Sequence, residues 1–428
     1  MDDVIVVGAG PAGNNTALGL ASRGHAVTVI DARQTIGDKL CTGIVGRECT
    51  RRFPIDPSLV YQDAAAADVT APGATDVRFE ASEPQGQIID RVAYVASFAQ
   101  RAQEQGANYL LNQRVQRVAP DAHGVSVVTD QGTYRSRAVV LASGFGSPLT
   151  RQVELGSVAD HVTGAQVEVS TFGATTGVSE EPGKVQIFVG SDVAPGFFSW
   201  LVPTSPGRAL AGILARRQAP DHLSKFIQQL RRDGKIDAVV RNSACWGIPL
   251  RPLKTTYKSR VLVAGDAAGQ VKPTTGGGIY YSLLASEIAS EVLDEALSED
   301  DLSASRLSHY QRRWKALLSK ELEVGYSARR LFEALSDQQI SSLVIQAGAK
   351  GTHNDLFNSG GLSFDWHSKL IGTIIRHPVM GSALGIINPL LARLAQSSDQ
   401  LPDQLSDLSF GFSSVTSSLP DPLPDSSS

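Results

Sequence analysis

The segment Val4-Ile5-Val6-Val7-Gly8-Ala9-Gly10-Pro11-Ala12-Gly13 determines the predicted fold. Its apolar run, residues 4–7, is bounded by glycine, as in a buried parallel strand. The G-x-G-x-x-G pattern then leads into a predicted helix through Leu20, and a second apolar strand is expected over residues 26–30. Strand, glycine-rich turn, helix and strand in this order predict the first unit of a Rossmann-like domain.

The glycines of this turn have separate physical roles. Gly8 permits the tight turn, Gly10 lets the backbone approach a pyrophosphate, and Gly13 allows close packing of helix on strand. The amides at the helix N-terminus favour the anion. Asp31 closes the second strand 18 positions after Gly13, where its carboxylate suits a ribose diol and repels a 2′-phosphate. The alternative is a glycine-rich turn without a ligand.

A second strand-and-glycine segment lies far downstream. Apolar residues 261–264 lead into Gly265-Asp266, followed by Lys272-Pro273-Thr274-Thr275-Gly276-Gly277-Gly278-Ile279 and a predicted helix. With the first segment, this pairing resembles the FAD-dependent oxidoreductases of the glutathione-reductase-2 type, which include aromatic hydroxylases, flavin halogenases and geranylgeranyl reductases. The resemblance implies that Asp266 contacts the ribityl chain of FAD, and that Gly278 and Ile279 bring backbone N–H groups to the flavin. Alternatively, Asp266 only caps a helix.

Three further positions resemble cofactor contacts of this superfamily. Arg91 precedes a predicted helix where relatives carry an arginine on the FAD, and Val115 matches a strand whose backbone pairs with adenine. Gly144 follows Ser143 where many relatives have Ala-Asp-Gly. The missing acid at Ser143 argues against a hydroxylase-like use of pyridine nucleotide. Arg91 and Val115 could also be purely structural.

The segment Pro195-Gly196-Phe197-Phe198-Ser199-Trp200-Leu201-Val202-Pro203 resembles the P-x-x-Y-x-W-x-F-P signature of geranylgeranyl reductases. The resemblance implies a substrate wall that includes Phe198, Trp200 and Pro203. An isoprenoid chain needs such a long apolar groove, because it has no polar group beyond its head. Alternatively, these residues pack the core of a second domain, and the same stretch comes close to the W-x-W-x-I-P of halogenases.

A cysteine-containing loop also resembles the geranylgeranyl reductases. It runs Ile36-Gly37-Asp38-Lys39-Leu40-Cys41-Thr42-Gly43-Ile44, with Thr42 in place of the usual first glycine. The resemblance assigns Cys41, Thr42 and Gly43 to the cofactor site, with Cys41 as a catalytic candidate beside the flavin. Cys41 would act as proton donor or as a shape element; a buried structural thiol is the alternative.

The implied activity is hydride transfer from reduced flavin to isolated C=C bonds of a prenyl chain in an isoprenoid lipid, a quinone or a chlorophyll precursor. The alternative is an FAD-dependent monooxygenase or halogenase acting on an aromatic or apolar small molecule. We find no second dinucleotide fingerprint in the sequence, so the external electron donor stays open between NAD(P)H and ferredoxin.

The predicted architecture is α/β, or α+β over the whole chain. A Rossmann-like FAD-binding domain, residues 1–160 and 252–300, is interrupted by an antiparallel-sheet substrate domain, residues 161–251. A helical region follows over residues 301–396. Residues 397–428 are rich in Ser, Asp and Pro and predict a flexible tail.

The composition argues against several functional classes of protein. With 39 Lys+Arg against 43 Asp+Glu, the net charge of −4 argues against a nucleic-acid partner. Three cysteines indicate a reducing, cytoplasmic setting without a disulfide scaffold, and the eight histidines show no metal-ligand spacing. We expect no secretory signal and no membrane span. Apolar residues between 370 and 391 predict helix packing or, alternatively, peripheral contact with a membrane surface.

Overall fold

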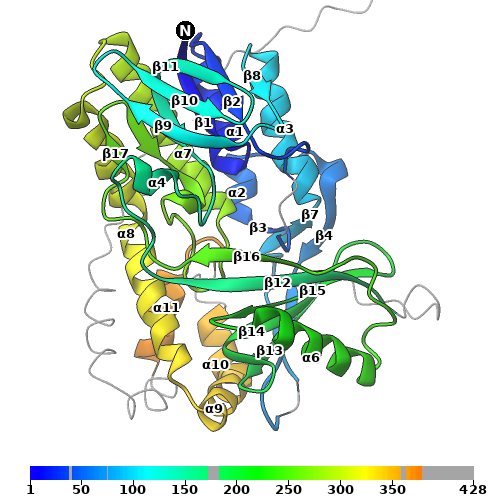
Figure 1. The fold of residues 1–428 in the computed structure, drawn as a ribbon. Coiled ribbons are helices and arrows are strands. Elements are labelled where there is room, and N and C mark those ends of the chain that lie inside the picture. Colours follow the sequence, from blue (N-terminus) through cyan, green and yellow to red (C-terminus); the bar gives the residue numbers. More distant parts are fainter. Residues whose placement is uncertain (38–40, 75, 172–182, 358–362, 378–428) are drawn as a thin grey trace, which may run out of the picture.

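The computed structural model describes residues 1–37, 41–74, 76–171, 183–357 and 363–377, and it contains two large sheets (Figure 1). The first sheet has the order β17-β18-β11-β1-β2-β8, and the antiparallel strands β9 and β10 extend from β11. Its strands are β1 (Asp2–Val7), β2 (Val27–Ile30), β8 (Asn108–Leu110), β9 (Val115–Pro120), β10 (Val125–Thr129), β11 (Thr133–Leu141), β17 (Tyr257–Lys258) and β18 (Val261–Val263).

The centre of this sheet is parallel and buried, as the apolar strand sequences predict. β1 pairs in parallel with β2 and β11, and β18 pairs in parallel with β11. Three helices, α1 (Pro11–Ala21), α3 (Arg91–Glu104) and α7 (Ile279–Ser298), pack together over one face. The expected Rossmann-like domain, completed by a distant segment of the chain, is therefore confirmed.

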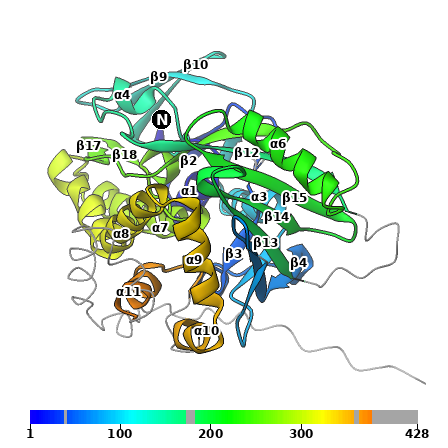
Figure 2. The ribbon, with the colours of Figure 1, turned by 90° about the horizontal axis from the view of Figure 1, so that it is seen from below.

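The second sheet is largely antiparallel, with the order β16-β12-β15-β14-β13-β5-β6. Its strands are β5 (Ala66–Thr70), β6 (Val77–Glu80), β12 (His161–Ser170), β13 (Lys184–Gly190), β14 (Ala194–Pro203), β15 (Arg208–Ala215) and β16 (Ala244–Pro249). Helix α6 (Ala219–Arg232) covers one face, as Figure 2 shows from below. The sequence pattern predicted this sheet over residues 161–251 alone. The structure adds β5 and β6, which join through parallel pairing of β5 with β13.

A small third sheet, β3 (Ile44–Gly46), β7 (Gly86–Ile89) and β4 (Val60–Ala64), begins directly after Cys41-Thr42-Gly43. Short elements complete this unit and the first: α2 (Arg47–Arg52), α4 (Leu149–Gln152), η1 (Pro57–Leu59) and η2 (Gly265–Ala267). The small sheet holds the Cys41 segment against α3, because the Ile89 amide donates to the Gly43 carbonyl at 2.9 Å.

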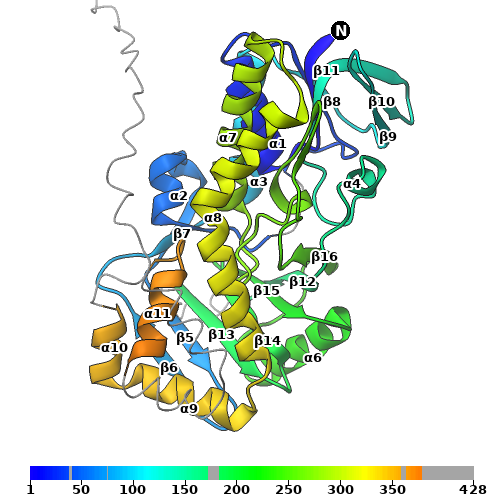
Figure 3. The same cartoon turned by 90° about the vertical axis from the view of Figure 1, so that its left-hand side faces the viewer.

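One long helix, α8 (Ala304–Glu333), connects the two large units (Figure 3). It contacts α7 and β17 of the first unit and β14 of the second. Beyond it lie α9 (Asp337–Gly348), α10 (Lys350–Phe357) and α11 (Ser368–Arg376). The expected helical region is thus present, whereas residues 378–396 and the predicted tail lie outside the described residues. Within the described part of the chain, no helix is long and apolar enough to cross a membrane.

Candidate active site

The first glycine loop, residues 8–13, has the geometry of a phosphate cradle. Gly8 has φ of +109°, and a Cβ on Gly13 would lie 1.8 Å from the Gly8 carbonyl oxygen, so neither position accepts a side chain. A Cβ on Gly10 would meet no described atom within 4 Å. Gly10 also begins α1 without a side-chain cap, which leaves the first amides of the helix available to an anion.

Asp31 lies directly beside this loop. Its Oδ2 accepts a hydrogen bond from the Ala9 amide at 2.7 Å, and its Oδ1 accepts one from the Arg33 amide at 2.7 Å. The Gln113 amide donates to the Asp31 carbonyl at 2.9 Å, which brings the chain just before Val115 to the same edge of the sheet. The structure therefore places Asp31 beside Gln113, two residues before Val115, and the adenine contact of Val115 stays a prediction.

The second glycine loop, residues 272–278, follows β18 and η2, and the carboxyl end of β18 lies at the same edge of the first sheet as that of β1. Gly265 has φ of +69°, and a Cβ there would lie 2.9 Å from Cβ of Ala12 in α1. A Cβ on Gly278 would lie 2.9 Å from Oδ1 of Asp266. Gly278 begins α7 without a side-chain cap. The backbone amides of Ile279 and the residues after it are therefore available to a ligand at this second helix N-terminus.

Arg91, at the start of α3, lies beside the segment that contains Cys41 and Gly43. Arg91 is buried in the first turn of α3, and a Cβ on Gly43 would lie 3.6 Å from its Cβ. Gly43 has φ of +74° and Gly144 has φ of +76°. A Cβ on Gly144 would meet no atom of the described chain within 4 Å, so this glycine faces open space.

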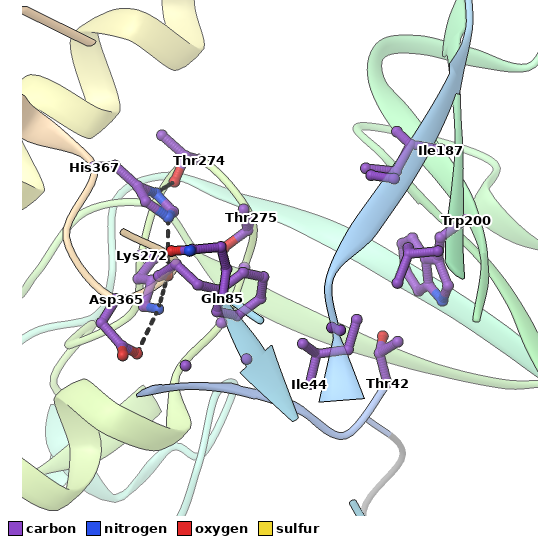
Figure 4. A pocket seen from close by; sticks show the side chains of 18 of the residues that line it. Thr42, Ile44, Gln85, Ile187, Trp200, Lys272, Thr274, Thr275, Asp365 and His367 are labelled. Carbon is purple, nitrogen blue, oxygen red and sulfur yellow. Dashed lines mark hydrogen bonds and ion pairs between the residues drawn. The ribbon is translucent and has the colours of Figure 1, made fainter. Parts of the chain in front are cut away.

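A cavity of about 640 Å³ lies between the second glycine loop and the second sheet. Cys41 and Thr42 line it together with Gly276, Gly277 and Gly278. Its opposite wall is apolar and includes residues of β13, β14, β15 and β16: Ile187, Phe198, Trp200, Val202, Leu214, Trp246 and Ile248. Figure 4 shows Trp200 and Ile187 across the cavity from Lys272, Thr274 and Thr275. The residues that line the cavity do not include Pro203, which ends β14.

Gln166 joins two predicted site segments, although it lies in none of the predicted site motifs. Its Oε1 accepts hydrogen bonds from Trp200 Nε1 at 3.2 Å and from Thr42 Oγ1 at 3.3 Å. Its Nε2 donates to the Cys41 carbonyl at 3.5 Å, and the side chain is fully buried. Gln166 therefore fixes the indole relative to the Cys41 segment. No local signal marked Gln166, because it alternates with valines in β12 as Glu168 and Ser170 do.

A polar cluster at the second glycine loop was also missed. Lys272 donates to the Phe364 carbonyl at 2.6 Å and pairs with Asp365 at 3.4 Å. Burial lowers the pKa of Lys272, which the Asp365 charge counteracts. His367 bonds Thr274 Oγ1 through Nδ1, and burial together with the Lys272 charge lowers its pKa to about 3. Lys272 stood in the quoted motif, whereas nothing local marked Asp365 or His367.

Comparisons with known proteins agree with this geometry. The family model for FAD dependent oxidoreductases matches residues 45–235, and a model for NAD(P)-binding Rossmann-like domains matches residues 6–45. Digeranylgeranylglycerophospholipid reductase 2 of Methanopyrus kandleri is 30% identical over 361 residues, which cover 80% of this chain and 89% of the relative. The chain belongs to the geranylgeranyl reductase family. Digeranylgeranylglycerophospholipid reductase 1 of Methanococcoides burtonii is 27% identical, with 80% and 86% covered.

Solved structures show the same fold as this geranylgeranyl reductase family member. A geranylgeranyl bacteriochlorophyll reductase-like protein from Thermoplasma acidophilum matches with a TM-score of 0.77 and 20% identity, covering 90% of this chain and 98% of that one. Halogenase PltM matches with a TM-score of 0.65 and 16% identity, covering 93% and 95%. The cofactor of this family member is FAD. The open space at Gly10 and Gly144 and the two uncapped helix N-termini fit that group.

Proposed function

We propose that this FAD-dependent oxidoreductase reduces isolated C=C bonds in the prenyl chain of an isoprenoid lipid, a quinone or a chlorophyll precursor. One observation carries the proposal: an apolar cavity extends from the second glycine loop to the Phe198 and Trp200 wall. The names of the relatives, which are reductases of digeranylgeranyl phospholipids, support the same substrate class.

FAD, once reduced by an external donor such as NAD(P)H or ferredoxin, supplies the hydride for one alkene carbon. The amides of Gly278 and Ile279 at the start of α7 would orient the flavin. Phe198 and Trp200, whose ring centroids are 5.8 Å apart, would hold the chain and exclude water. Cys41 lines the cavity, and its Sγ is our candidate to deliver the proton to the other alkene carbon.

The halogenase neighbours share the fold, and a common fold does not determine chemistry. The test is anaerobic incubation of dithionite-reduced protein with geranylgeranyl lipids, followed by mass spectrometry. A reductase adds two hydrogens per reduced bond without oxygen. A monooxygenase or halogenase instead forms product only with oxygen, and consumes it in proportion.

We also propose contact with a membrane surface through the C-terminal region. Leu370 and Ile371 of α11 line the cavity, while Ile374 and Ile375 pack near Val324 of α8. In the sequence, α11 is followed by the apolar residues 379–391, which lie outside the described part of the chain. Liposome flotation of the full chain against a variant lacking residues 378–428 tests this, because only the full chain should float.

A further inference from the structure

Arg329 of α8 is a charged residue in the wall of the apolar cavity. Its side chain is 4% exposed, yet it lines the cavity together with Ala328 and Phe332. The guanidinium Cζ lies 3.6 Å from the centroid of the Phe197 ring and 5.0 Å from that of Phe332. These two cation–π contacts fix the position of the guanidinium, as a preorganised binding group requires.

The donors of this guanidinium are incompletely paired. Nε and Nη2 have no hydrogen-bond partner among the described residues. The nearest carboxylate oxygen, Oε1 of Glu333, lies 3.6 Å from Nε, beyond hydrogen-bond distance. That oxygen accepts a 2.7 Å bond from Arg216, and the other oxygen of Glu333 lies 3.7 Å from Arg330. Glu333 is therefore shared between three arginines.

The cluster around Arg329 carries an excess of positive charge. Arg216, Arg329 and Arg330 face Glu333 and Asp160, so three cations face two anions. Burial lowers the pKa of Arg329 to about 9 even though Glu333 acts in the opposite direction. A buried cation without a full partner is costly, and an anion in the cavity would relieve that cost.

We propose that Arg329 binds the anionic phosphate head group of the prenyl lipid and thereby determines which substrates the enzyme accepts. This assignment rests on the proposed function. Gly325, one turn earlier in α8, touches the second glycine loop, since a Cβ there would lie 3.3 Å from Cδ of Pro273. Four residues of helix span about 6 Å. A head group held at Arg329 therefore lies at the α8 wall of the cavity, about one helical turn beyond the contact of α8 with the second glycine loop and beside Phe197 of β14.

A neighbouring polar recess suits a phosphate less well. It adjoins the cavity through Gln85, Gly86 and residues 363–365, and it contains two arginines and four carboxylates: Arg47, Arg51, Glu48, Asp63, Glu83 and Asp365. Arg47 is paired with Glu83. The negative excess of this recess repels an anion, whereas the positive excess around Glu333 attracts one.

Binding to the oxidised, FAD-loaded full chain tests the assignment without turnover, because no electron donor is present. Farnesyl phosphate and farnesol are titrated while tryptophan fluorescence is followed, since Trp200 lines the cavity. Arg329→Gln should weaken the binding of farnesyl phosphate at least tenfold and should leave the affinity for farnesol within twofold of the wild type. Arg312→Gln removes the same charge from an exposed position of the same helix that does not line the cavity, and it should change neither. Inorganic phosphate alone should not displace farnesyl phosphate.

Three results would overturn the assignment. Equal weakening of both ligands by Arg329→Gln would make Arg329 a structural residue, and no weakening of either would remove it from the site. Displacement by inorganic phosphate at similar concentration would indicate a free-phosphate site. If Arg329→Gln loses FAD or unfolds, Arg329→Lys replaces it, and it should weaken only farnesyl phosphate because lysine lacks the bidentate fork. If the protein prefers farnesyl phosphate as expected but does not reduce alkenes, the proposed function is refuted and the assignment of Arg329 is not.

Discussion

Nζ of Lys272 lies 3.4 Å from Oδ1 of Asp365, and the two side chains are only 4% and 2% exposed. Oδ2 of Asp365 also accepts hydrogen bonds from the amides of Glu48 at 2.9 Å and Cys49 at 3.2 Å. This ion pair therefore joins the second glycine loop, the start of α2 and the segment before α11. Three stretches that are distant in sequence are held around one end of the cavity.

Breaking this pair should destabilise the protein strongly. Asp365→Asn leaves Lys272 buried beside a neutral partner, and loss of one member of a buried pair costs about 3–5 kcal/mol. Urea unfolding measures the difference. Glu83→Gln, at the exposed pair with Arg47, is the control and should leave the free energy of unfolding unchanged. A stability of Asp365→Asn within about 1 kcal/mol of the wild type would show that the pair is not a structural anchor.

His367 should make the protein sensitive to acid. Its pKa falls from 6.5 to about 3 in the folded state, so the unfolded chain binds the proton first. His367 therefore does not change the free energy of unfolding above pH 6.5, and it lowers that free energy as the pH decreases from 6.5 towards 3. His367→Gln should remove about 1–3 kcal/mol of the stability difference between pH 7 and pH 4.5, measured by urea unfolding. Parallel pH profiles of the variant and the wild type would contradict this.

Substitutions at two glycines of the first loop should distinguish an effect on folding from an effect on cofactor binding. Gly13→Ala would push a methyl group to 1.8 Å from the Gly8 carbonyl and should disrupt the domain. Gly10→Ala meets no described atom within 4 Å, so it should fold normally and bind FAD about tenfold more weakly or worse. Gly351→Ala, also open, is the control. FAD titration and thermal melting of the FAD-free protein check this; normal FAD affinity in Gly10→Ala would count against the cradle.

Cys41→Ala should retain FAD and reduce alkene turnover by about a hundredfold or more, the lower part of the range for a positioned proton donor. The exposed Cys245 supplies the control, because Cys245→Ala removes a thiol that does not line the cavity. Steady-state rates and FAD content are compared for both variants. Unchanged turnover in Cys41→Ala would exclude the thiol from the reaction.

The sequence revealed those parts of the site that lie within short continuous motifs. Gly8, Gly13 and Gly278 could be predicted because each sits in a strand-turn-helix pattern that dictates its backbone geometry. Asp266 and Trp200 came from the resemblance of their segments to motifs of known families. Each of these residues can be identified from the residues next to it in the sequence.

The remaining features depend on contacts between distant segments. Lys272 and Asp365 are 93 positions apart, and Gln166 meets Trp200 only through the pairing of β12 and β14 with β15. Strands β5 and β6 join the second sheet through a parallel pairing that no local periodicity encodes. Arg329 becomes unusual only once its burial against Phe197 is known.

The most direct test of alkene reduction is anaerobic single-turnover reoxidation of the flavin. Protein with its FAD fully reduced is mixed with a geranylgeranyl lipid in the absence of oxygen, and the flavin absorbance is followed. We expect the flavin to reoxidise at a rate that rises with lipid concentration, with one reduced double bond per flavin and no effect of the fully saturated lipid. A flavin that stays reduced until oxygen is admitted would contradict the proposed function.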